Sequence, residues 1–263
     1  MKVFGVAGVP DYEVLSFEEK SSEYCLLVPV LNEAGRIEKE LERGRRFGVD
    51  KAADIIILDG GSNDGGVGCD MLKEFGVNAL LTKTGPGRQG AQLRMGFHFA
   101  LERGYCGFVT VDGNNKDSIE DVPAFIEKLK EGYGFVQGSR YIKGGTAENT
   151  PFYRHIAVRC LHAPLISKAA GFKYTDTTNA FRAYSREYIS DEITDIFRDV
   201  FSGYELLAYL SVRATQTGYK AIEIPAARRY PKNQKTPTKI SPISGSAELL
   251  RILVNTVRGK YRP

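Results

Sequence analysis

The sequence predicts an α/β fold with a doubly wound, mostly parallel sheet flanked by helices. Short apolar runs alternate with segments of helical spacing, beginning with YCLLVPV at 24–30 and DIIIL at 54–58. These runs are almost continuously apolar, which is typical of parallel strands that are covered on both faces. Each run ends abruptly in polar residues, and ligands of open α/β sheets bind outside such carboxyl ends.

The composition fits one large globular domain or two small ones. The 263 residues are 42% hydrophobic and 26% charged, which excludes global disorder. The net charge of +4 is spread without a basic run, so we expect no nucleic-acid partner. Four scattered cysteines and three histidines give little material for a zinc site or a Ser-His-Asp triad. With no signal peptide and no long apolar run, we expect a cytoplasmic protein, active there or at the inner face of the membrane.

The chain divides by its patterns into three parts. Residues 1–23 mix Gly, Pro and acids and are expected to form a peripheral extension, 24–245 the main domain, and 246–263 an amphipathic helix. Strands are predicted where β-branched and aromatic residues cluster, at 24–30, 54–58, 79–81, 108–111, 134–137 and 221–225, with a short one within 175–184. Helices are predicted where apolar residues recur at helical spacing, at 36–46, 69–75, 92–103, 122–131, 153–170, 203–217 and 247–258. Residues 228–245, rich in Pro, Lys, Arg and Thr, are expected to form an extended basic loop.

The segment FVTVDGNNKD at 108–117 carries the strongest chemical signal. A buried strand ends at Asp112, and Gly113 and Asn114 follow. Asp112 and Asn114 are two residues apart and can point their oxygens at one divalent ion, which would clamp a diphosphate. The alternative is a turn rich in Asp and Asn, since both residues favour turns.

Two upstream strand ends are of the same kind. Asn32 and Glu33 follow the first strand, and Asp59 follows the second with Gly60 and Gly61 behind it. Asp59 can accept a hydrogen bond from a base or a ribose hydroxyl, and the glycines leave room for a flat ring. Taken singly, such residues also serve as helix caps or turns. Together, three polar ends at one sheet edge predict a pocket for a polar ligand.

Several segments, in this order, resemble the family 2 glycosyltransferases of the GT-A fold. They are VPVLNE (28–33), LDGGSNDGG (58–66), a Gly-rich loop before QLRMG (92–96), and VDGN (111–114). Later segments resemble the dolichol-phosphate mannose synthase-like branch: GSRY (138–141), TDTTNAFR (175–182) and GYELLAYL to YKAIEIPAARR (203–229). The resemblance covers roughly residues 24 to 240. The sequence departs from the family pattern at Asn114, where the metal motif D-x-D has a second acid, at Gly60, at 179–180 and in a stretched late basic segment.

The resemblance implies a GDP- or UDP-linked sugar donor, Mg²⁺ or Mn²⁺ at the D-x-D position, and inversion at the anomeric carbon. It also implies a polyprenyl-phosphate-type acceptor. The implied donor and metal residues are Pro29, Leu31, Glu33, Asp59, Gly61, Arg94, Asp112, Gly113 and Asn114, with Asp112 and Asn114 at the metal. The implied acceptor-phosphate residues are Arg140, Arg182, Arg229 and Lys239.

Two points of function stay open at this level. A phosphate acceptor is already anionic and needs cations rather than a base, and arginine binds phosphate in a bidentate way. If the acceptor is instead a sugar hydroxyl of a lipid-linked or surface polysaccharide glycan, a carboxylate base is needed, and Glu205 and Asp176 are the candidates. The neutral Asn114 also leaves a non-catalytic nucleotide-sugar binding module as an alternative. A nucleotidyltransferase is less favoured, because LNEAGR is not a Gly-rich, Lys-bearing loop.

Two helices have apolar faces flanked by basic residues, at 153–170 and 247–258. Such helices dock on anionic membranes that carry a lipid acceptor. The alternatives are packing on the sheet or a homodimer contact, and we favour packing for the final helix.

Overall fold

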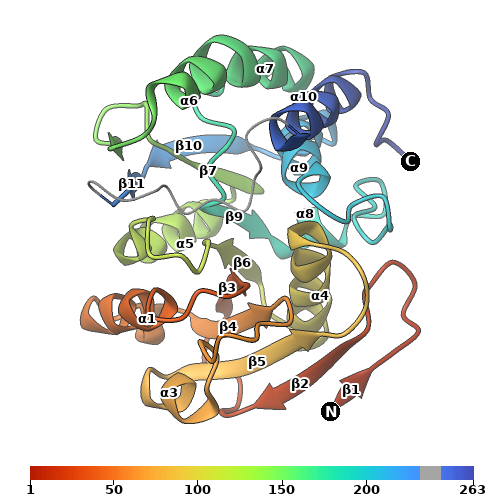
Figure 1. Cartoon of the computed structure of the whole chain (residues 1–263). Helices are drawn as coiled ribbons and strands as arrows, with labels where there is room; N and C mark the ends of the chain where they lie inside the picture. The colour runs from red at the N-terminus through yellow and green to blue at the C-terminus, as the bar shows by residue number, and fades with distance from the viewer. Residues whose placement is uncertain (232–243) are drawn as a thin grey trace.

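The computed structural model describes residues 1–231 and 244–263. In this part of the chain, one nine-stranded sheet has the order β1-β2-β5-β4-β3-β6-β9-β7-β10. Helices lie on both of its faces (Figure 1). Strands β3, β4, β5 and β6 are parallel, as are β7 and β10, while β9 runs antiparallel between β6 and β7. The predicted α/β fold with a mostly parallel sheet is confirmed.

The strands of the main sheet are β1 (Lys2–Val3), β2 (Tyr12–Ser16), β3 (Tyr24–Val30), β4 (Asp54–Asp59), β5 (Val77–Lys83), β6 (Gly107–Thr110), β7 (Phe135–Ser139), β9 (Arg182–Ser185) and β10 (Ala221–Pro225). A second, two-stranded sheet pairs β8 (Thr146–Glu148) with β11 (Ala227–Arg229) in parallel. The helices are α1 (Ile37–Arg46), α2 (Val49–Ala52), α3 (Cys69–Glu74), α4 (Gln89–Glu102), η1 (Ile119–Asp121), α5 (Val122–Lys130), α6 (Phe152–Ile156), the π-helical η2 (Ala157–His162), α7 (Ala163–Ala170), α8 (Arg186–Ser190), α9 (Glu205–Gln216) and α10 (Ser244–Val257). In the part of the chain that the structure describes, a helix able to cross a bilayer is not found.

The core consists of two apolar layers, one on each face of the sheet. All six residues of β4 are buried, which explains its unbroken apolar run. Ile55 and Ile57 face the layer that contains residues of α1, α3 and α5, whereas Ile56 and Leu58 face the layer that contains residues of α4, α7 and α9. Successive residues of a strand point to opposite faces, so both layers draw on the same strands.

The two ends of the chain pack on this core. The N-terminal segment, expected as a peripheral extension, adds β2 antiparallel to β5 at the edge of the main sheet, with Tyr12 opposite Lys83. At the other end, α10 packs against α9 and α7 and buries Ile252 and Leu253. The arrangement of α10 agrees with the packing interpretation that the sequence favoured.

The register of the central strands brings their carboxyl ends to one edge. Val30 of β3 lies opposite Asp59 of β4, and Leu27 opposite Thr110 of β6. Gln92 of α4 ties the first two ends together, because its Nε2 donates to the carbonyls of Val30 at 2.9 Å and Leu58 at 2.7 Å. The loops after β3, β4 and β6 therefore start from neighbouring points, as the sequence predicted.

The loop after β6 is pressed against β3 at Gly113. Its N–H donates to the carbonyl of Pro29 at 3.1 Å. A Cβ at this position would lie 2.8 Å from Val30 Cγ2 and 3.0 Å from Val28 Cγ1. Only glycine allows the loop to approach β3 this closely without displacing the core.

We predict that Gly113→Ala lowers the free energy of unfolding by about 1–3 kcal/mol, because the added methyl group overpacks this contact. The measurement is urea unfolding followed by circular dichroism. Gly68→Ala is the matched control, since a Cβ at Gly68 meets nothing within 4 Å. Equal stability of the two variants would contradict the close packing.

Candidate active site

Asp112 lies at the centre of the site and joins three parts of the chain. It lies two residues after the end of β6, and its Oδ1 accepts a hydrogen bond from Gln89 Nε2 at 2.8 Å, at the start of α4. Its Oδ2 lies 3.2 Å from Arg228 Nη2, on β11. The side chain keeps 22% of its surface exposed. Gln89 and Arg228 thus fix the orientation of a carboxylate that still reaches solvent.

Arg228 is a buried cation shared between two carboxylates. Besides Asp112, its guanidinium donates to Asp117, whose side chain is fully buried. Burial alone would lower the pKa of Arg228, but the charges of Asp117 and Asp112 outweigh it and hold the pKa well above its ordinary value. Arg228 therefore stays charged next to Asp112.

The sequence selected Arg229 for the acceptor phosphate, but the structure turns Arg229 outward. It is exposed and pairs with Glu148 at 3.2 Å and Glu120 at 3.4 Å. Neighbouring residues of a strand point to opposite sides, so only one of the two arginines can face Asp112. Arg228, its neighbour on β11, is the arginine that contacts Asp112, and the acceptor role implied for Arg229 stays a prediction. The sequence analysis expected an extended loop from 228 onward, so it had no strand alternation with which to separate the two arginines.

Asn114 supplies an oxygen without a hydrogen-bond partner. Its Oδ1 is buried and unpaired within the described residues, while its Nδ2 lies 3.4 Å from Asp112 Oδ2. The N–H of Asn114 donates to the carbonyl of Asp112 at 2.7 Å, which closes a tight turn. An orphaned amide oxygen beside a carboxylate has the donor chemistry that suits Mg²⁺ or Mn²⁺. Over residues 1–231 and 244–263, no set of three acidic, His or Cys side chains could hold an ion. The remaining ligands would therefore be water and ligand oxygens.

The loops after β3 and β4 are joined by side-chain hydrogen bonds. Asp59 is buried, and its Oδ1 accepts from the N–H of Ser62 at 2.9 Å and from its hydroxyl at 2.6 Å. The Ser62 hydroxyl oxygen in turn accepts from the N–H of Asn32 at 2.9 Å. Gly61 has a φ of 95°, which only glycine adopts readily. Asp59 thus shapes the loop with one carboxylate oxygen, and its contact with a base stays a prediction.

The other residues predicted to flank a nucleotide lie at the same sheet edge. Pro29 is part of β3, Leu31 follows it with its side chain exposed, and Glu33 pairs with Arg36 just before α1. All are close in sequence to Val30, whose carbonyl accepts from Gln92 and from the N–H of Gly60. The structure therefore brings Pro29, Leu31 and Glu33 to the edge that carries Asp59.

Arg94 has a different position from the one implied for it. It is buried in α4, where its guanidinium donates to the carbonyl of Gly8 and lies 3.0 Å from Asp199 Oδ1. These contacts join α4 to the N-terminal loop. At the start of the same helix, Gln89 holds Asp112, and sequence reasoning missed it because the predicted helix began at 92.

Arg140 and Asp176 form a buried, bidentate ion pair. Arg140 Nε lies 2.6 Å from Asp176 Oδ2, and Nη2 lies 2.9 Å from Oδ1. Nη2 also donates to Thr178 Oγ1 at 2.7 Å. Burial alone would raise the pKa of Asp176, but the charge and hydrogen bonds of Arg140 outweigh it and lower the pKa. The pair joins the end of β7 to the loop at 175–178. The roles implied for Arg140 at an acceptor phosphate and for Asp176 as a base stay predictions.

Arg182 is also buried, with 1% of its surface exposed. Its three nitrogens donate to the carbonyls of Asn179 at 2.9 Å, Leu207 at 2.5 Å and Thr177 at 2.9 Å. These bonds anchor the loop before β9 to α9. They give Arg182 a positioning role, and a direct contact with an acceptor phosphate would require them to break. The acceptor role implied for Arg182 stays a prediction.

Glu205 and Lys239 complete the predicted set. Glu205 is largely buried at the first turn of α9, and its Oε2 accepts from the N–H of Gly203 at 2.7 Å. Lys239 lies outside the described residues. Two cations that the sequence analysis did not single out lie near Arg228: Lys116 Nζ is 5.5 Å from the centroid of the Tyr230 ring, and Arg154 Nη1 donates to the Tyr230 hydroxyl at 3.0 Å.

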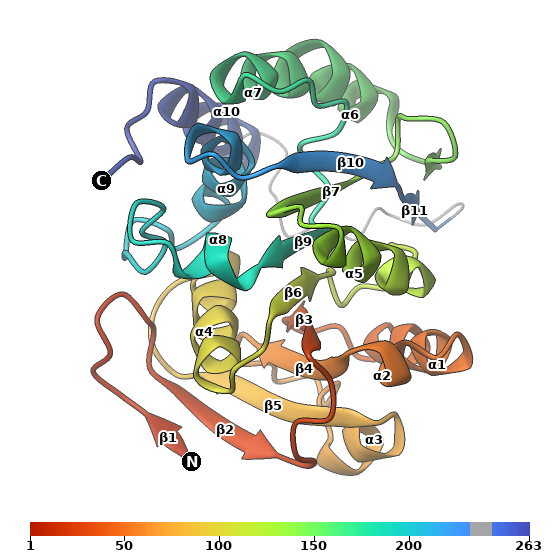
Figure 2. The ribbon, with the colours of Figure 1, turned by 180° about the vertical axis from the view of Figure 1, so that it is seen from behind.

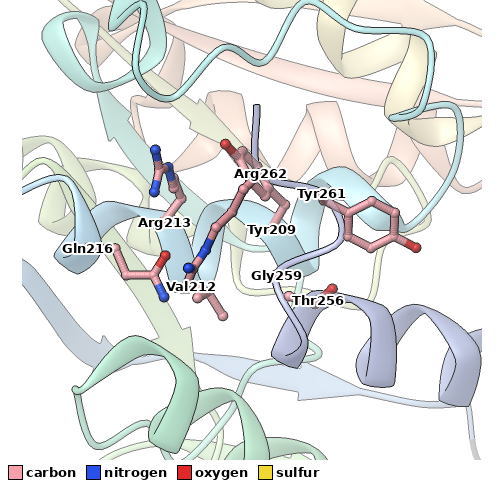
Figure 3. A pocket seen from close by; sticks show the side chains of 8 residues that line it. All are labelled: Tyr209, Val212, Arg213, Gln216, Thr256, Gly259, Tyr261 and Arg262. Carbon is pink, nitrogen blue, oxygen red and sulfur yellow. The ribbon is translucent and has the colours of Figure 1, made fainter.

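Two cavities of the structure lie away from these residues. One, of about 10 Å³, sits between α9 and the C-terminal segment near Tyr209 and Tyr261 (Figure 3), and it has room for one water at most. The other, of about 380 Å³, lies beside the start of β3 and is lined by Tyr24 and Lys130 among others. Neither cavity is lined by Asp59, Asp112 or Asn114.

Comparison with known proteins gives relatives of one kind. No protein-family model matches the chain. The polyprenol monophosphomannose synthase of Mycolicibacterium smegmatis is 29% identical over 204 residues, which cover 76% of this chain and 75% of the relative. The undecaprenyl-phosphate mannosyltransferase of Micrococcus luteus is 27% identical over 204 residues, covering 76% of this chain and 80% of the relative.

Solved structures show the same fold. The glucosyl-3-phosphoglycerate synthase of Mycobacterium tuberculosis, crystallised with Mn²⁺, UDP and glucosyl-3-phosphoglycerate, matches with a TM-score of 0.60 at 19% identity. The match covers 90% of this chain and 79% of that one. The same enzyme with Mn²⁺, UDP and phosphoglyceric acid gives a TM-score of 0.62 at 16% identity. The GT-A fold and the resemblance to the dolichol-phosphate mannose synthase-like branch are confirmed.

We predict that Arg182→Ala lowers the free energy of unfolding by about 3 kcal/mol or more, because it removes three buried hydrogen bonds from a charged donor. Urea unfolding measures the change. Arg229→Ala is the control, since its exposed ion pairs contribute at most about 1 kcal/mol. If Arg182→Ala is as stable as Arg229→Ala but inactive in sugar transfer, the positioning role is wrong and direct acceptor binding is favoured.

Proposed function

We propose that this chain, as a relative of the polyprenyl-phosphate mannosyltransferases, is an inverting glycosyltransferase. Its donor would be a GDP- or UDP-linked sugar and its acceptor a polyprenyl phosphate. The observation that carries the proposal is the alignment of Asp59, Asp112 and Asn114 at one edge of the sheet. The names of the relatives support the acceptor class.

Asp112 and Asn114 are the residues that would hold a divalent cation. Such an ion neutralises the negative charge that grows on the departing diphosphate. The chain's own residues prepare this position: Gln89 and Arg228 fix the Asp112 carboxylate, and Gly113 presses the loop against β3. Arg228 adds a permanent positive charge beside the same carboxylate, where it would also face the diphosphate.

The contacts of the two candidate bases, Asp176 and Glu205, favour a phosphate acceptor over a sugar hydroxyl. A phosphate monoester is anionic at pH 7 and attacks without a general base, whereas a hydroxyl requires one. Asp176 is buried against Arg140, and Glu205 accepts the N–H of Gly203. With Arg140 and Arg182 engaged elsewhere, we assign attraction of the acceptor phosphate to the cations around Tyr230. We further propose that transfer takes place at the cytoplasmic face of the membrane that carries the lipid.

We predict that Asp112→Ala lowers transfer by about a hundredfold or more, since it removes the only carboxylate of the metal motif. Asn114→Asp should tighten Mn²⁺ binding, because it adds a negative charge beside Asp112. The measurements are transfer of sugar from GDP- and UDP-sugars to a polyprenyl phosphate, and calorimetric titration of each nucleotide with and without Mn²⁺. Asn255→Asp on α10 is the charge-matched control.

The titrations separate the alternatives. Failure of wild type to bind either nucleotide, with or without Mn²⁺, would contradict the donor site itself. Nucleotide binding without transfer to any lipid phosphate or glycan acceptor would instead support the non-catalytic binding module. Mn²⁺ affinity that is the same in Asn114→Asp and wild type would remove residue 114 from the metal site.

A further inference from the structure

Segments α6, η2 and α7 form one continuous helix from 152 to 170 that carries an exposed apolar stripe. Its four large side chains are Phe152, Tyr153, Ile156 and Leu161, exposed by 77%, 65%, 48% and 44%. Ala157, Cys160 and Pro164 are also exposed, so the stripe recurs every three to four residues along one side of the helix. The opposite side packs on the core through Val158, Ala163, Ile166 and Ala170. The helix thus exposes to solvent a side that is apolar over several turns.

The charges on the helix that carries the stripe and on its flanking residues are all of one sign. From 149 to 175 the chain contains no Asp or Glu, although the whole sequence has 32. The same stretch holds four cations, Arg154, Arg159, Lys168 and Lys173, together with two histidines. Arg159, Lys168 and Lys173 are exposed. An apolar stripe with exposed cations and no acids is complementary to an anionic lipid surface.

The helix lies at one end of the molecule, next to the site. Figures 1 and 2 both show α6 and α7 beyond the edge strand β10, with no other labelled helix or strand outside them. Arg154 on α6 donates to the Tyr230 hydroxyl at 3.0 Å, and the Arg228 guanidinium lies 5.8 Å from the centroid of the Tyr230 ring. Arg228 in turn contacts Asp112. Two residues therefore connect this helix to the centre of the site.

We propose that the stripe on α6, η2 and α7, defined by Phe152, Tyr153, Ile156 and Leu161, docks on an anionic lipid bilayer. The inference rests on the proposed function, because the bilayer in question is the one that carries the lipid phosphate. Apolar side chains enter the boundary between headgroups and acyl chains, while Arg159 and Lys168 contact anionic headgroups. Docking in this orientation places the Tyr230 region near the membrane surface, where an acceptor phosphate lies.

A second copy of the chain fits this surface less well. A two-fold contact would bring the cations of both stripes together, and no acid between 149 and 175 is available to pair with them. A bilayer with anionic headgroups supplies the missing negative charge. The charge pattern therefore favours an anionic lipid surface over a second copy of the chain as the partner of the stripe.

The experiment measures sedimentation of the whole chain with vesicles of phosphatidylcholine alone or mixed with phosphatidylglycerol, without donor or acceptor. The triple variant Phe152→Ser, Ile156→Ser, Leu161→Ser should bind mixed vesicles at least about tenfold more weakly than wild type. Arg159→Gln with Lys168→Gln should lose roughly tenfold on mixed vesicles and little on neutral ones. The matched control is Phe4→Ser, Phe47→Ser, Ile193→Ser, which removes side chains that are 57%, 58% and 63% exposed elsewhere.

Each result decides the question. Unchanged vesicle binding by the stripe variant, an equal loss in the control, or no binding by wild type would overturn the proposal. So would a wild-type dimer in the absence of lipid that the stripe variant converts to monomer. Transfer to a short-chain, water-soluble prenyl phosphate should persist in the stripe variant, which separates docking from chemistry. If no chain transfers sugar but the stripe still governs vesicle binding, docking stands and the proposed function fails.

Discussion

The guanidinium of Arg228, shared between Asp112 and Asp117, is the interaction on which the site depends. It joins β11 of the small sheet to the loop after β6, and it is buried with one fully buried carboxylate and one partly exposed carboxylate. The fully buried Asp117 carboxylate depends on this adjacent cation to offset the cost of burying its charge. Beneath the loop, Glu40 is also fully buried and accepts the N–H of Asn115 at 2.7 Å. Burial raises the pKa of Glu40 well above its ordinary value.

This charge balance explains how the site can use a neutral amide at 114. A second carboxylate there would grip a divalent cation more tightly, but it would also offset the positive charge that Arg228 brings. With Asn114, the loop offers one partly exposed carboxylate and one amide oxygen, and Arg228 of β11 places a guanidinium beside the carboxylate. A diphosphate bound there would then meet two positive groups, a divalent cation and the Arg228 guanidinium, and one negative group, the Asp112 carboxylate.

The sequence was informative where local pattern decides the structure and uninformative where long-range contacts decide it. The strand ends at Asp59 and Asp112 were predictable, because an apolar run that stops at an acid has one interpretation in a parallel sheet. Arg228 and Arg229 could not be told apart, since the direction of each is set by pairing of β11 with β8, where Arg228 lies opposite Ala147. The burial of Arg140 depends on Asp176, which is 36 residues away. A sequence motif contains the same arginine whether its side chain faces a ligand or the core. The pairing of the N-terminal strand with β5 is likewise a long-range contact without a local signal.

The position of Tyr230 links the lipid-facing side of the molecule to the donor side. Three cations surround its ring and hydroxyl: Arg154 from α6, Lys116 from the loop after β6, and Arg228 from β11. Burial alone would raise the pKa of Tyr230, but the charge of Arg228 and its neighbours outweighs it and lowers the pKa. A net lowering in a largely buried phenol means that the local potential is positive. The same potential attracts an anion that enters from the side of α6, and it decreases toward Asp112, where the carboxylates lie. A phosphate on a membrane-held lipid would therefore come to rest between the helix and the metal loop, within reach of a donor at the sheet edge.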